Sequence, residues 1–486
     1  MGRRAVDVIL VTLLVLGGYS AAEAQVRPSP PSEARVLSLA EAVRLALANN
    51  LSLQDTVDSV YGAQISQDLA ESRFDIKLTP SFAGGFGSQN GQARRYGFEA
   101  SKVLPYGATL SAGATNESAR TDLNDFNASN LSFTLTQPLL RGFGPKSTQF
   151  DLQNAKRGRL SAERNLEVSR QRLAVDVVAS YYDIVRQEGL IDVAEKSVER
   201  SRELLRASEA RLKVGLASQL DVFRAELLLS QAEESLLNRE EALELAMDTF
   251  KFNLGLDPKD DVYLEMVEPD YQPVTLDLDA QTQLALNNRL EIREERDRIR
   301  DAARGVSVSR QNLLPQLDLN VRYERLGLGN TLSESFHFDT DAFGVFLSTS
   351  YPLDQSAERA SLAQSQLDLS ARRRAVQFVE YNITREVRAA CRNVERIGKS
   401  IGLQEKNIDF AEKQLRLATL RYQRGLANNF DVIDAENNLI SARSSYVSLI
   451  ADYNVARVEL ERVTGILDLQ EDFVPGSAAP SARHHP

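Results

Sequence analysis

Two aspartates near the end of the chain, Asp431 and Asp434, have the clearest potential for chemistry. They lie three residues apart in a helical pattern, so their carboxylates share one face of a helix. No basic residue is adjacent to neutralise their charge. The pattern has two interpretations: a pair of carboxylates that attracts cations, or two solvated charges that only help solubility.

The sequence around these aspartates occurs twice. Segments 211–237 and 421–447 are identical at 11 of 27 positions without a gap. The first segment has Asp221 and Arg224 where the second has Asp431 and Asp434, and an aspartate and an arginine at this spacing can neutralise each other. Asp221 and Asp431 each follow a turn, where a carboxylate can cap the unpaired N–H groups of the returning helix. We expect shared positions to serve structure and differing positions to serve function.

The sequence contains no recognisable catalytic, cofactor-binding or metal-binding constellation, so we predict a protein that is not an enzyme and holds no cofactor or metal. Its three histidines, His337, His484 and His485, form no cluster with cysteines, and the single cysteine, Cys391, excludes an intrachain disulfide. The glycine-rich segment 84–87 lies in a strand-like region without a following helix, unlike a phosphate-binding loop. The net charge of −11 argues against nucleic acid as a partner.

Residues 1–24 have the features of a secretory signal peptide. Arg3 and Arg4 precede an apolar run at 8–16, and Ala22-Glu23-Ala24 has the small-x-small pattern of a cleavage site. No cysteine follows the run, so processing as a lipoprotein is not expected. We therefore expect an exported protein whose mature chain begins with a Pro-rich segment, 25–36.

The repetition extends over the whole chain and predicts an internal tandem duplication. Each copy shows the same order of helices, strands and a long helical hairpin. The first copy spans 37–256, with helices at 37–73, strands at 78–140 and the hairpin at 146–253. The second copy spans 276–466, with helices at 276–313, strands at 315–353 and the hairpin at 355–463. A proline-containing linker at 257–275 separates the copies, and 467–486 is expected to be a disordered tail.

The long helical patterns carry an apolar residue at every seventh position, as coiled coils do. The first copy has Val177, Ile184, Ile191, Val198, Leu205 and Leu212, and the second has Val387, Val394, Ile401, Ile408, Leu415 and Tyr422. A helix over 146–213 would be about 100 Å long at about 1.5 Å per residue. Such a helix must lie lengthwise along other helices.

The strand-like segments alternate apolar and polar residues, most strictly at 131–136 and 317–323. Alternation indicates strands with two different environments, either core and solvent in a sandwich or lipid and water in a membrane barrel. The signal peptide, the small number of strands and the aromatic residues near strand ends favour a barrel shared by several chains. These aromatic residues are Tyr96, Phe133, Phe336 and Tyr351.

These features resemble the TolC-like outer membrane efflux proteins, also called outer membrane factors, over nearly the whole mature chain. The resemblance rests on the duplicated elements at 215–222 and 425–432, which begin Gly-Leu-Ala and end Asp-Val. Further marks are the segments 38–42 and 137–139 and the glycines at the helix ends, Gly255 and Gly465.

The resemblance implies a mixed α and β fold in a homotrimer. Each protomer would give a few strands to a shared transmembrane β-barrel in the outer membrane, continued by a periplasmic α-helical coiled-coil barrel. The family's usual complement is two strands per copy and twelve per trimer. This chain has two additional candidate strands at 96–103 and 107–115, so the resemblance leaves its strand number open.

The function implied is a passive exit duct of a tripartite efflux pump or a type I secretion system. Its partners would be outer-membrane lipid, a periplasmic adaptor and an inner-membrane transporter of the RND, ABC or MFS type. Asp431 and Asp434 would form the pore constriction and gate at the periplasmic helical tips, a ring of carboxylates that favours cations. The hairpin tips would contact the adaptor through Gly215, Leu216, Ala217, Ser218, Gly425, Leu426, Ala427 and Asn428.

The alternative function is a periplasmic coiled-coil scaffold or adaptor without a pore. It accounts for the seven-residue repeats and the signal peptide, but not for strand segments with alternating faces. A scaffold should be soluble without detergent.

Overall fold

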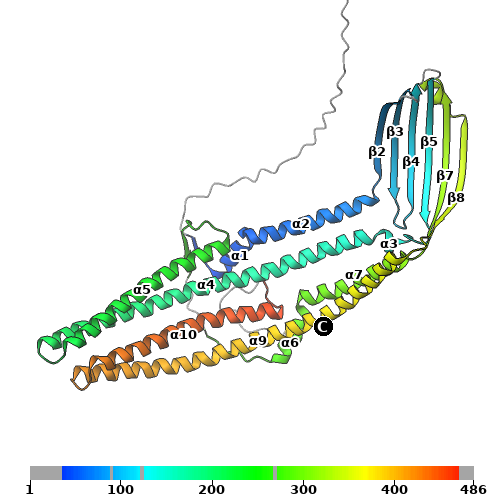
Figure 1. Cartoon of the computed structure of the whole chain (residues 1–486). Helices are drawn as coiled ribbons and strands as arrows, with labels where there is room; N and C mark the ends of the chain where they lie inside the picture. Colours follow the sequence, from blue (N-terminus) through cyan, green and yellow to red (C-terminus); the bar gives the residue numbers. More distant parts are fainter. Residues whose placement is uncertain (1–34, 88–90, 121–124, 266–270, 470–486) are drawn as a thin grey trace, which may run out of the picture.

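The computed structural model describes residues 35–87, 91–120, 125–265 and 271–469 of the chain. The predicted signal peptide and most of the Pro-rich segment and C-terminal tail lie outside these ranges. An elongated array of helices ends in one antiparallel sheet, and this order of helices, strands and long helices occurs twice along the chain (Figure 1). The fold is therefore mixed α and β, as the sequence predicts.

The first half of the chain forms two short and two long helical segments. Their bounds are Leu39–Asn49 (α1), Leu51–Glu71 (α2), Phe150–Lys213 (α4) and Gln219–Leu254 (α5), with one-turn helices Ser72–Phe74 (η1) and Pro145–Thr148 (α3) beside the strands. Ser38 and Glu41 start α1 with a reciprocal capping box. The long α4 ends at a turn that contains Gly215, and α5 ends at Gly255.

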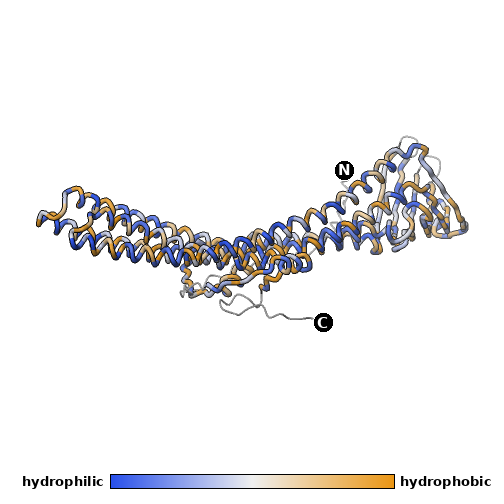
Figure 2. Tube along the Cα trace, turned by 90° about the horizontal axis from the view of Figure 1, so that it is seen from below, coloured by the Kyte–Doolittle hydropathy of each residue, from blue (hydrophilic) through white to orange (hydrophobic). Residues whose placement is uncertain are grey.

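The second half has the same arrangement of helices. Their bounds are Leu278–Asn288 (α6), Leu290–Gln311 (α7), Ser356–Gln423 (α9) and Asn429–Thr464 (α10), with a one-turn helix Leu332–Ser335 (α8) between two strands. α5 packs against α4, α4 against α10, and α10 against α9 (Figure 1). Hydrophilic and hydrophobic residues are mixed along the whole helical array (Figure 2). In the described ranges, none combines the length and apolar character that crossing a membrane requires.

Six strands form one sheet in the order β2-β3-β4-β5-β7-β8, and all neighbours are antiparallel. Their bounds are Lys77–Gly87 (β2), Gly91–Val103 (β3), Thr109–Arg120 (β4), Asp125–Pro138 (β5), Gln316–Gly329 (β7) and Thr340–Ser350 (β8). The two additional candidate strands of the first half are β3 and β4, which lie inside the sheet. The segment expected to be a plain linker, 257–275, contains a short strand, Val262–Leu264 (β6), which pairs in parallel with Arg35–Leu37 (β1).

The strand register places apolar and polar side chains on opposite faces of the sheet, because successive side chains of a strand alternate. On one face Phe82 lies beside Tyr96, and Phe133 beside Tyr323, with ring centroids 5.2 and 6.5 Å apart. On the other face Thr136 donates to Asn320, which donates to Ser348. The apolar face is well exposed at Phe82, Phe86, Phe343, Val345 and Leu347.

Apolar cores lie between the long helices and the short ones. Val177 and Ile184 of α4 pack with α1 and α5, and Val387 and Ile401 of α9 pack with α6 and α10. These four residues of the predicted seven-residue repeats are buried. The repeat therefore marks the face on which each long helix meets its neighbours. Leu467, placed by the sequence in the disordered tail, is also buried.

A charge network joins the two halves of the chain close to the sheet. Arg157 and Arg164 of α4 and Arg300 of α7 all pair with Asp297, which is only 3% exposed. Arg164 also reaches Glu294 at 2.7 Å. Several partners satisfy the buried carboxylate, which is the condition under which a buried charge is tolerated.

Gly255 and Gly465 end α5 and α10 in the left-handed conformation, with φ of 71° and 73°. A Cβ at Gly255 would lie 2.4 Å from the backbone oxygen of Asn49, whereas at Gly465 the nearest atom would be the Cβ of Asn288 at 3.1 Å. The left-handed conformation costs about 1–2 kcal/mol for a residue with a Cβ. We expect Gly255→Ala to lower the thermal unfolding temperature clearly more than Gly465→Ala, because it adds a backbone clash to the same strain.

Gly215→Ala is the matched control for this comparison. Its φ is 75°, and a Cβ there would meet nothing within 4 Å, so it carries the conformational strain alone. Circular dichroism of the three detergent-extracted variants measures the differences. Equal losses at Gly255 and Gly215 would contradict a steric role for the α5 end against α1.

Candidate functional site

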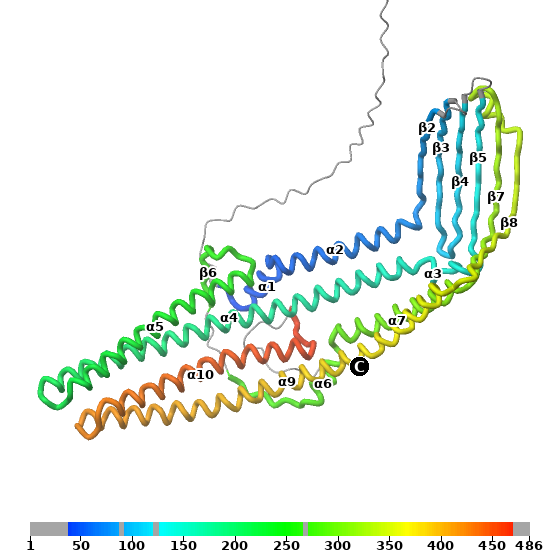
Figure 3. Tube along the Cα trace, viewed as in Figure 1, coloured from blue at the N-terminus to red at the C-terminus, as the bar shows by residue number. Residues whose placement is uncertain are grey.

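The two long helical hairpins turn at the end of the molecule farthest from the sheet (Figure 3). The first turn runs from Val214 to Ser218 and the second from Arg424 to Asn428. Gly215 and Gly425 take left-handed φ values of 75° and 76°. The N–H groups of the following leucines, Leu216 and Leu426, bond back to helix carbonyls five residues earlier at 2.8 and 2.9 Å. Both turns are therefore the same glycine-dependent helix stop.

The first turn is closed by a reciprocal cap. The Ser218 Oγ accepts from the Asp221 N–H at 3.2 Å, and the Asp221 carboxylate accepts from the Ser218 N–H at 2.9 Å. The N–H group of Ser218 lowers the pKa of Asp221 most strongly, and Arg224, 3.9 Å away, lowers it further. Asp221 is thus bound to the turn and its charge is largely balanced.

The carboxylates that follow the second turn are not bonded to the turn itself. Asn428 caps α10 by accepting from the Asp431 N–H at 3.3 Å, but the Asp431 carboxylate makes no return contact within the described part of the chain. Asp434 accepts from Asn438 at 3.3 Å. Both aspartates are exposed on the first turns of α10. The structure therefore places Asp431 and Asp434 together at one tip as a pair of solvent-facing anionic groups.

The two tips are connected to each other. The buried Asn429 donates to the Asp221 carbonyl at 2.6 Å, and the hydroxyls of Ser208 and Tyr422 are 3.0 Å apart. The Arg211 guanidinium lies 4.6 Å from the centre of the Tyr422 ring and donates to the Tyr422 carbonyl. These contacts join α4 and α5 to α9 and α10 at the tips.

A second link between the halves lies farther from the tips. Glu436 of α10 is 3% exposed and accepts from the Arg200 Nε of α4 at 2.8 and 2.9 Å. Burial raises the pKa of Glu436 in spite of the nearby Arg200. Sequence reasoning missed this pair. Its only local signal is that Glu436 falls on the apolar stripe of α10 next to Val432, Ala435 and Leu439, which are buried.

Apolar side chains are exposed at both tips, another feature that the sequence analysis missed. Leu216 and Leu426, which were predicted as contact residues, are 69% and 75% exposed. The same exposure extends to neighbours on the turns and the returning helices, namely Val214, Leu220, Phe223 and Phe430. A group of exposed apolar side chains can serve as a protein interaction site.

Asp221→Ala should lower stability by about 1 kcal/mol, the usual effect of a lost helix cap. Because the folded-state pKa of Asp221 is below its ordinary value, its contribution is present above that ordinary value and is lost as the pH falls through the lowered pKa. Thermal unfolding between pH 3 and pH 7 measures this contribution of Asp221 to stability.

Asp431→Ala is the matched control, since its carboxylate makes no return bond to the turn. It should lose less stability than Asp221→Ala. A larger loss for Asp431→Ala would contradict the difference between the two caps.

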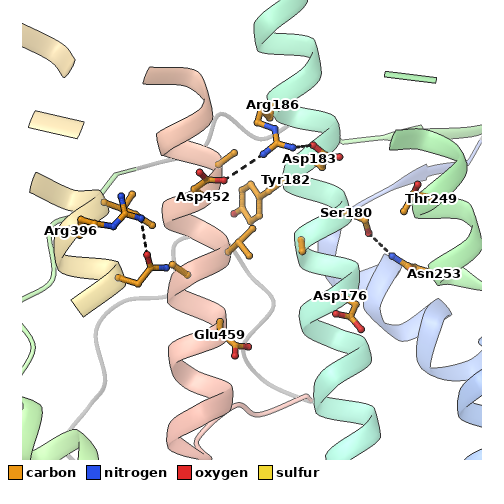
Figure 4. Close-up of a pocket in the computed structure, with 16 residues that line it drawn as sticks. Asp176, Ser180, Tyr182, Asp183, Arg186, Thr249, Asn253, Arg396, Asp452 and Glu459 are labelled. Atoms are coloured by element: carbon orange, nitrogen blue, oxygen red, sulfur yellow. Dashed lines mark hydrogen bonds and ion pairs between the residues drawn. The ribbon is translucent and has the colours of Figure 1, made fainter. Parts of the chain in front are cut away.

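A pocket of 670 Å³ lined by both polar and apolar side chains lies in the middle of the helical array, between α4, α5, α9 and α10 (Figure 4). Arg186 pairs with Asp183 on α4 and reaches Asp452 of α10 at 3.5 Å. Ser180 accepts from Asn253 of α5 at 3.2 Å.

The pocket contains acidic groups without catalytic geometry. Burial raises the pKa of Asp176, and Glu459 adds to this effect. Within the described ranges, no three His, Cys, Asp or Glu side chains are grouped to hold a metal ion. One ion pair, Arg186–Asp452, links α4 to α10 across the pocket, and the acidic residues Asp176, Asp183, Asp452 and Glu459 outnumber the basic ones in its lining.

Comparisons with known proteins agree with this architecture. The family model for outer membrane efflux proteins matches two segments, residues 100–255 and 282–466. Nodulation protein T of Rhizobium leguminosarum bv. trifolii is 19% identical over 421 residues, which cover 85% of this chain and 82% of that protein. Outer membrane efflux protein BepC of Brucella suis is 23% identical over 68% of this chain and 71% of its own length.

A solved structure shows the same fold. The outer membrane protein VceC from Vibrio cholerae superposes with a TM-score of 0.70 over 88% of this chain and 96% of its own. The two sequences are 18% identical. At this identity the likeness concerns the arrangement of helices and strands.

Proposed function

The chain belongs to the outer membrane efflux protein family, and on this basis we propose that it forms the exit duct of a tripartite efflux pump or a type I secretion system. Its relatives and fold are those of outer-membrane channel proteins and not of enzymes. Transport through this component is passive. Energy comes from an inner-membrane transporter of the RND, ABC or MFS type, which a periplasmic adaptor connects to the duct.

One observation carries this proposal: the sheet has one apolar and one polar face across its whole width, at one end of a long helical array. A membrane barrel needs an outer apolar band and a polar lining. The exposed Phe82, Phe343 and Leu347 would then face lipid, and Thr136 and Asn320 would line water. The helices continue the same wall into the periplasm.

The complete duct is a homotrimer with a closed barrel. A single sheet with open edges cannot cross a membrane, because unpaired backbone groups are not tolerated in hydrocarbon. Residues 1–24 act as the signal peptide that exports the chain. An ancestral duplication accounts for the two similar hairpins in each protomer, and three protomers arrange six such hairpins around a ring.

The hairpin tips form the periplasmic entrance. Asp431 and Asp434 supply its constriction, since threefold symmetry repeats these carboxylates near one level. The turns at 215–218 and 425–428 contact the adaptor, supported by their exposed leucines. Asp221 caps its helix beside this surface.

A pore-free periplasmic scaffold is the competing function. The observation against it is the exposed apolar face of the sheet, because a soluble protein rarely leaves so many aromatic and aliphatic side chains in water.

Single-channel recording in a planar bilayer tests the proposed function. The detergent-extracted protein should give discrete, cation-preferring conductance steps. Protein that is soluble without detergent and gives no steps would refute the duct and favour the scaffold.

A further inference from the structure

The β3–β4 hairpin lies within the sheet. β3 pairs with β2 over its length, and β4 pairs with β5. The register puts Tyr96, Phe98 and Leu110 on the same face as Phe82 and Phe133 of the flanking strands, with Tyr96 directly opposite Phe82. Each of these three residues is about half exposed. On this face one register row crosses all six strands with apolar or aromatic residues only, namely Leu78, Ala100, Ala112, Phe133, Tyr323 and Phe343.

The turn of this hairpin is also anchored at the helical end. The Tyr106 carbonyl accepts from the N–H of Gly144 at 3.1 Å, at the start of α3. Gly107 has a φ of 96°, and a Cβ there would lie 2.8 Å from the Gly142 carbonyl oxygen. The hairpin thus docks on the segment that connects the sheet to α4. Such close contacts are expected of a hairpin that is part of the sheet.

The edges of the sheet are β2 and β8, and within the described residues neither has a neighbour on its outer side. β2 runs away from the helices and β8 returns toward them (Figure 1). Because the number of strands per chain is even, β8 of one copy can pair with β2 of the next in the same antiparallel pattern. Copies of the sheet can therefore close on themselves without any other partner.

The widths of the sheet and of the helical layer agree when all six strands are counted. Strands about 4.8 Å apart, tilted by about 35–45°, each occupy about 6–7 Å of a barrel's circumference. Six strands then span about 36–41 Å, whereas four would span about 24–27 Å. The four helices α5, α4, α10 and α9, at about 8–10 Å each, span about 32–40 Å. One protomer thus spans about the same width in the sheet as in the helical layer.

We infer that each protomer contributes six strands to the barrel, so that a trimer has eighteen strands joined by β8–β2 pairs between copies. This inference rests on the proposed function, which supplies the trimer and the membrane. The barrel would be about 36 Å across between backbones, against about 24 Å for the twelve strands that the resemblance implies. The duct would keep nearly the width of its helical section through the membrane.

Disulfide trapping between copies tests this inference in the full-length protein. The native Cys391 is buried and is first changed to alanine. Thr79→Cys, on the polar face of β2, is then combined with single cysteines along the polar face of β8, and each variant is oxidised in the membrane. We expect disulfide-linked oligomers at one or two adjacent β8 positions, since a disulfide needs Cα atoms within about 7 Å. The β8 positions are Ala342, Phe346, Ser348 and Ser350.

Two further cysteine pairs serve as controls for this experiment. Thr79→Cys with Glu99→Cys should form a disulfide within one chain, because these residues are register partners, and so reports a folded sheet. Thr79→Cys with Ser132→Cys should not react, because two strands separate them at about 14 Å. A disulfide in this second pair would show β2 against β5 with the hairpin outside the wall, and would overturn the inference.

The size of the extracted protein separates failure of the inference from failure of the proposed function. Trimers that pass the Thr79–Glu99 control but give no β8–β2 disulfide at any position would refute the eighteen-strand barrel and leave the duct. Protein that forms no trimer and needs no detergent would refute the duct itself.

Discussion

Channels with alanine at both Asp431 and Asp434 should conduct severalfold more current than the unchanged protein and should lose most of their preference for cations. Both carboxylates are exposed on the first turns of α10, where we propose the constriction of the duct. A ring of carboxylates at a constriction attracts cations and excludes anions. Alanine at both positions shortens these side chains and removes their negative charge. Single-channel conductance and reversal potentials in a salt gradient measure the two effects.

Asp434→Arg separates charge from size. It gives the second tip the aspartate and arginine pair of the first, Asp221 and Arg224, which are 3.9 Å apart. This variant should lose cation preference without a wider pore, because arginine is larger than aspartate. If neither variant changes selectivity or conductance, the constriction lies elsewhere in the duct.

Much of the helical architecture follows from local patterns in the sequence. Seven of the twelve residues at every seventh position of α4 and α9, such as Val177 and Val387, are buried, because a helix with such a stripe must pack lengthwise. Alternation at 317–323 predicts β7 because successive side chains face different environments. Gly215 and Gly425 predict the turns because glycine readily takes positive φ.

The features that sequence reasoning missed depend on residues distant in the chain. β6 has three residues, too few for a periodic signal, and its partner β1 lies more than 200 residues earlier. The place of β3 and β4 within the sheet depends on strand pairing, which alternation alone does not specify. Arg200 and Glu436 are 236 residues apart and have no local sign of their contact.

In the candidate site, too, local features could be predicted from the sequence and contacts between distant residues could not. The turn residues at 215–218 and 425–428 could be located from sequence because each turn is a local structure. The contacts that join the tips through Asn429 and Tyr422 could not be located from sequence. Neither residue differs from an ordinary helix residue until its partner is known.

Glu436→Ala should destabilise the helical array by about 3 kcal/mol. The change leaves the Arg200 guanidinium partly buried without its anion, and breaking one side of a buried ion pair typically costs about 3–5 kcal/mol. The lower end applies because the Arg200 side chain keeps 28% of its exposure. Thermal unfolding followed by helical circular dichroism measures the loss. The exposed pair Lys196–Asp192 is the matched control on α4, where Asp192→Ala should cost well under 1 kcal/mol.

Arg200→Met combined with Glu436→Leu tests whether the loss comes from the unpaired charge. Apolar residues of similar volume can replace a buried ion pair at little or no cost, because no desolvated charge remains. The double variant should therefore be about as stable as the unchanged protein. Since burial raises the folded-state pKa of Glu436, the native state binds its proton more tightly than the unfolded state does. This residue's contribution then decreases as the pH rises from its ordinary pKa to the raised one, and the double variant should lack that slope. A double variant as unstable as Glu436→Ala would instead mean that the hydrogen bonds of this pair hold α4 and α10 together.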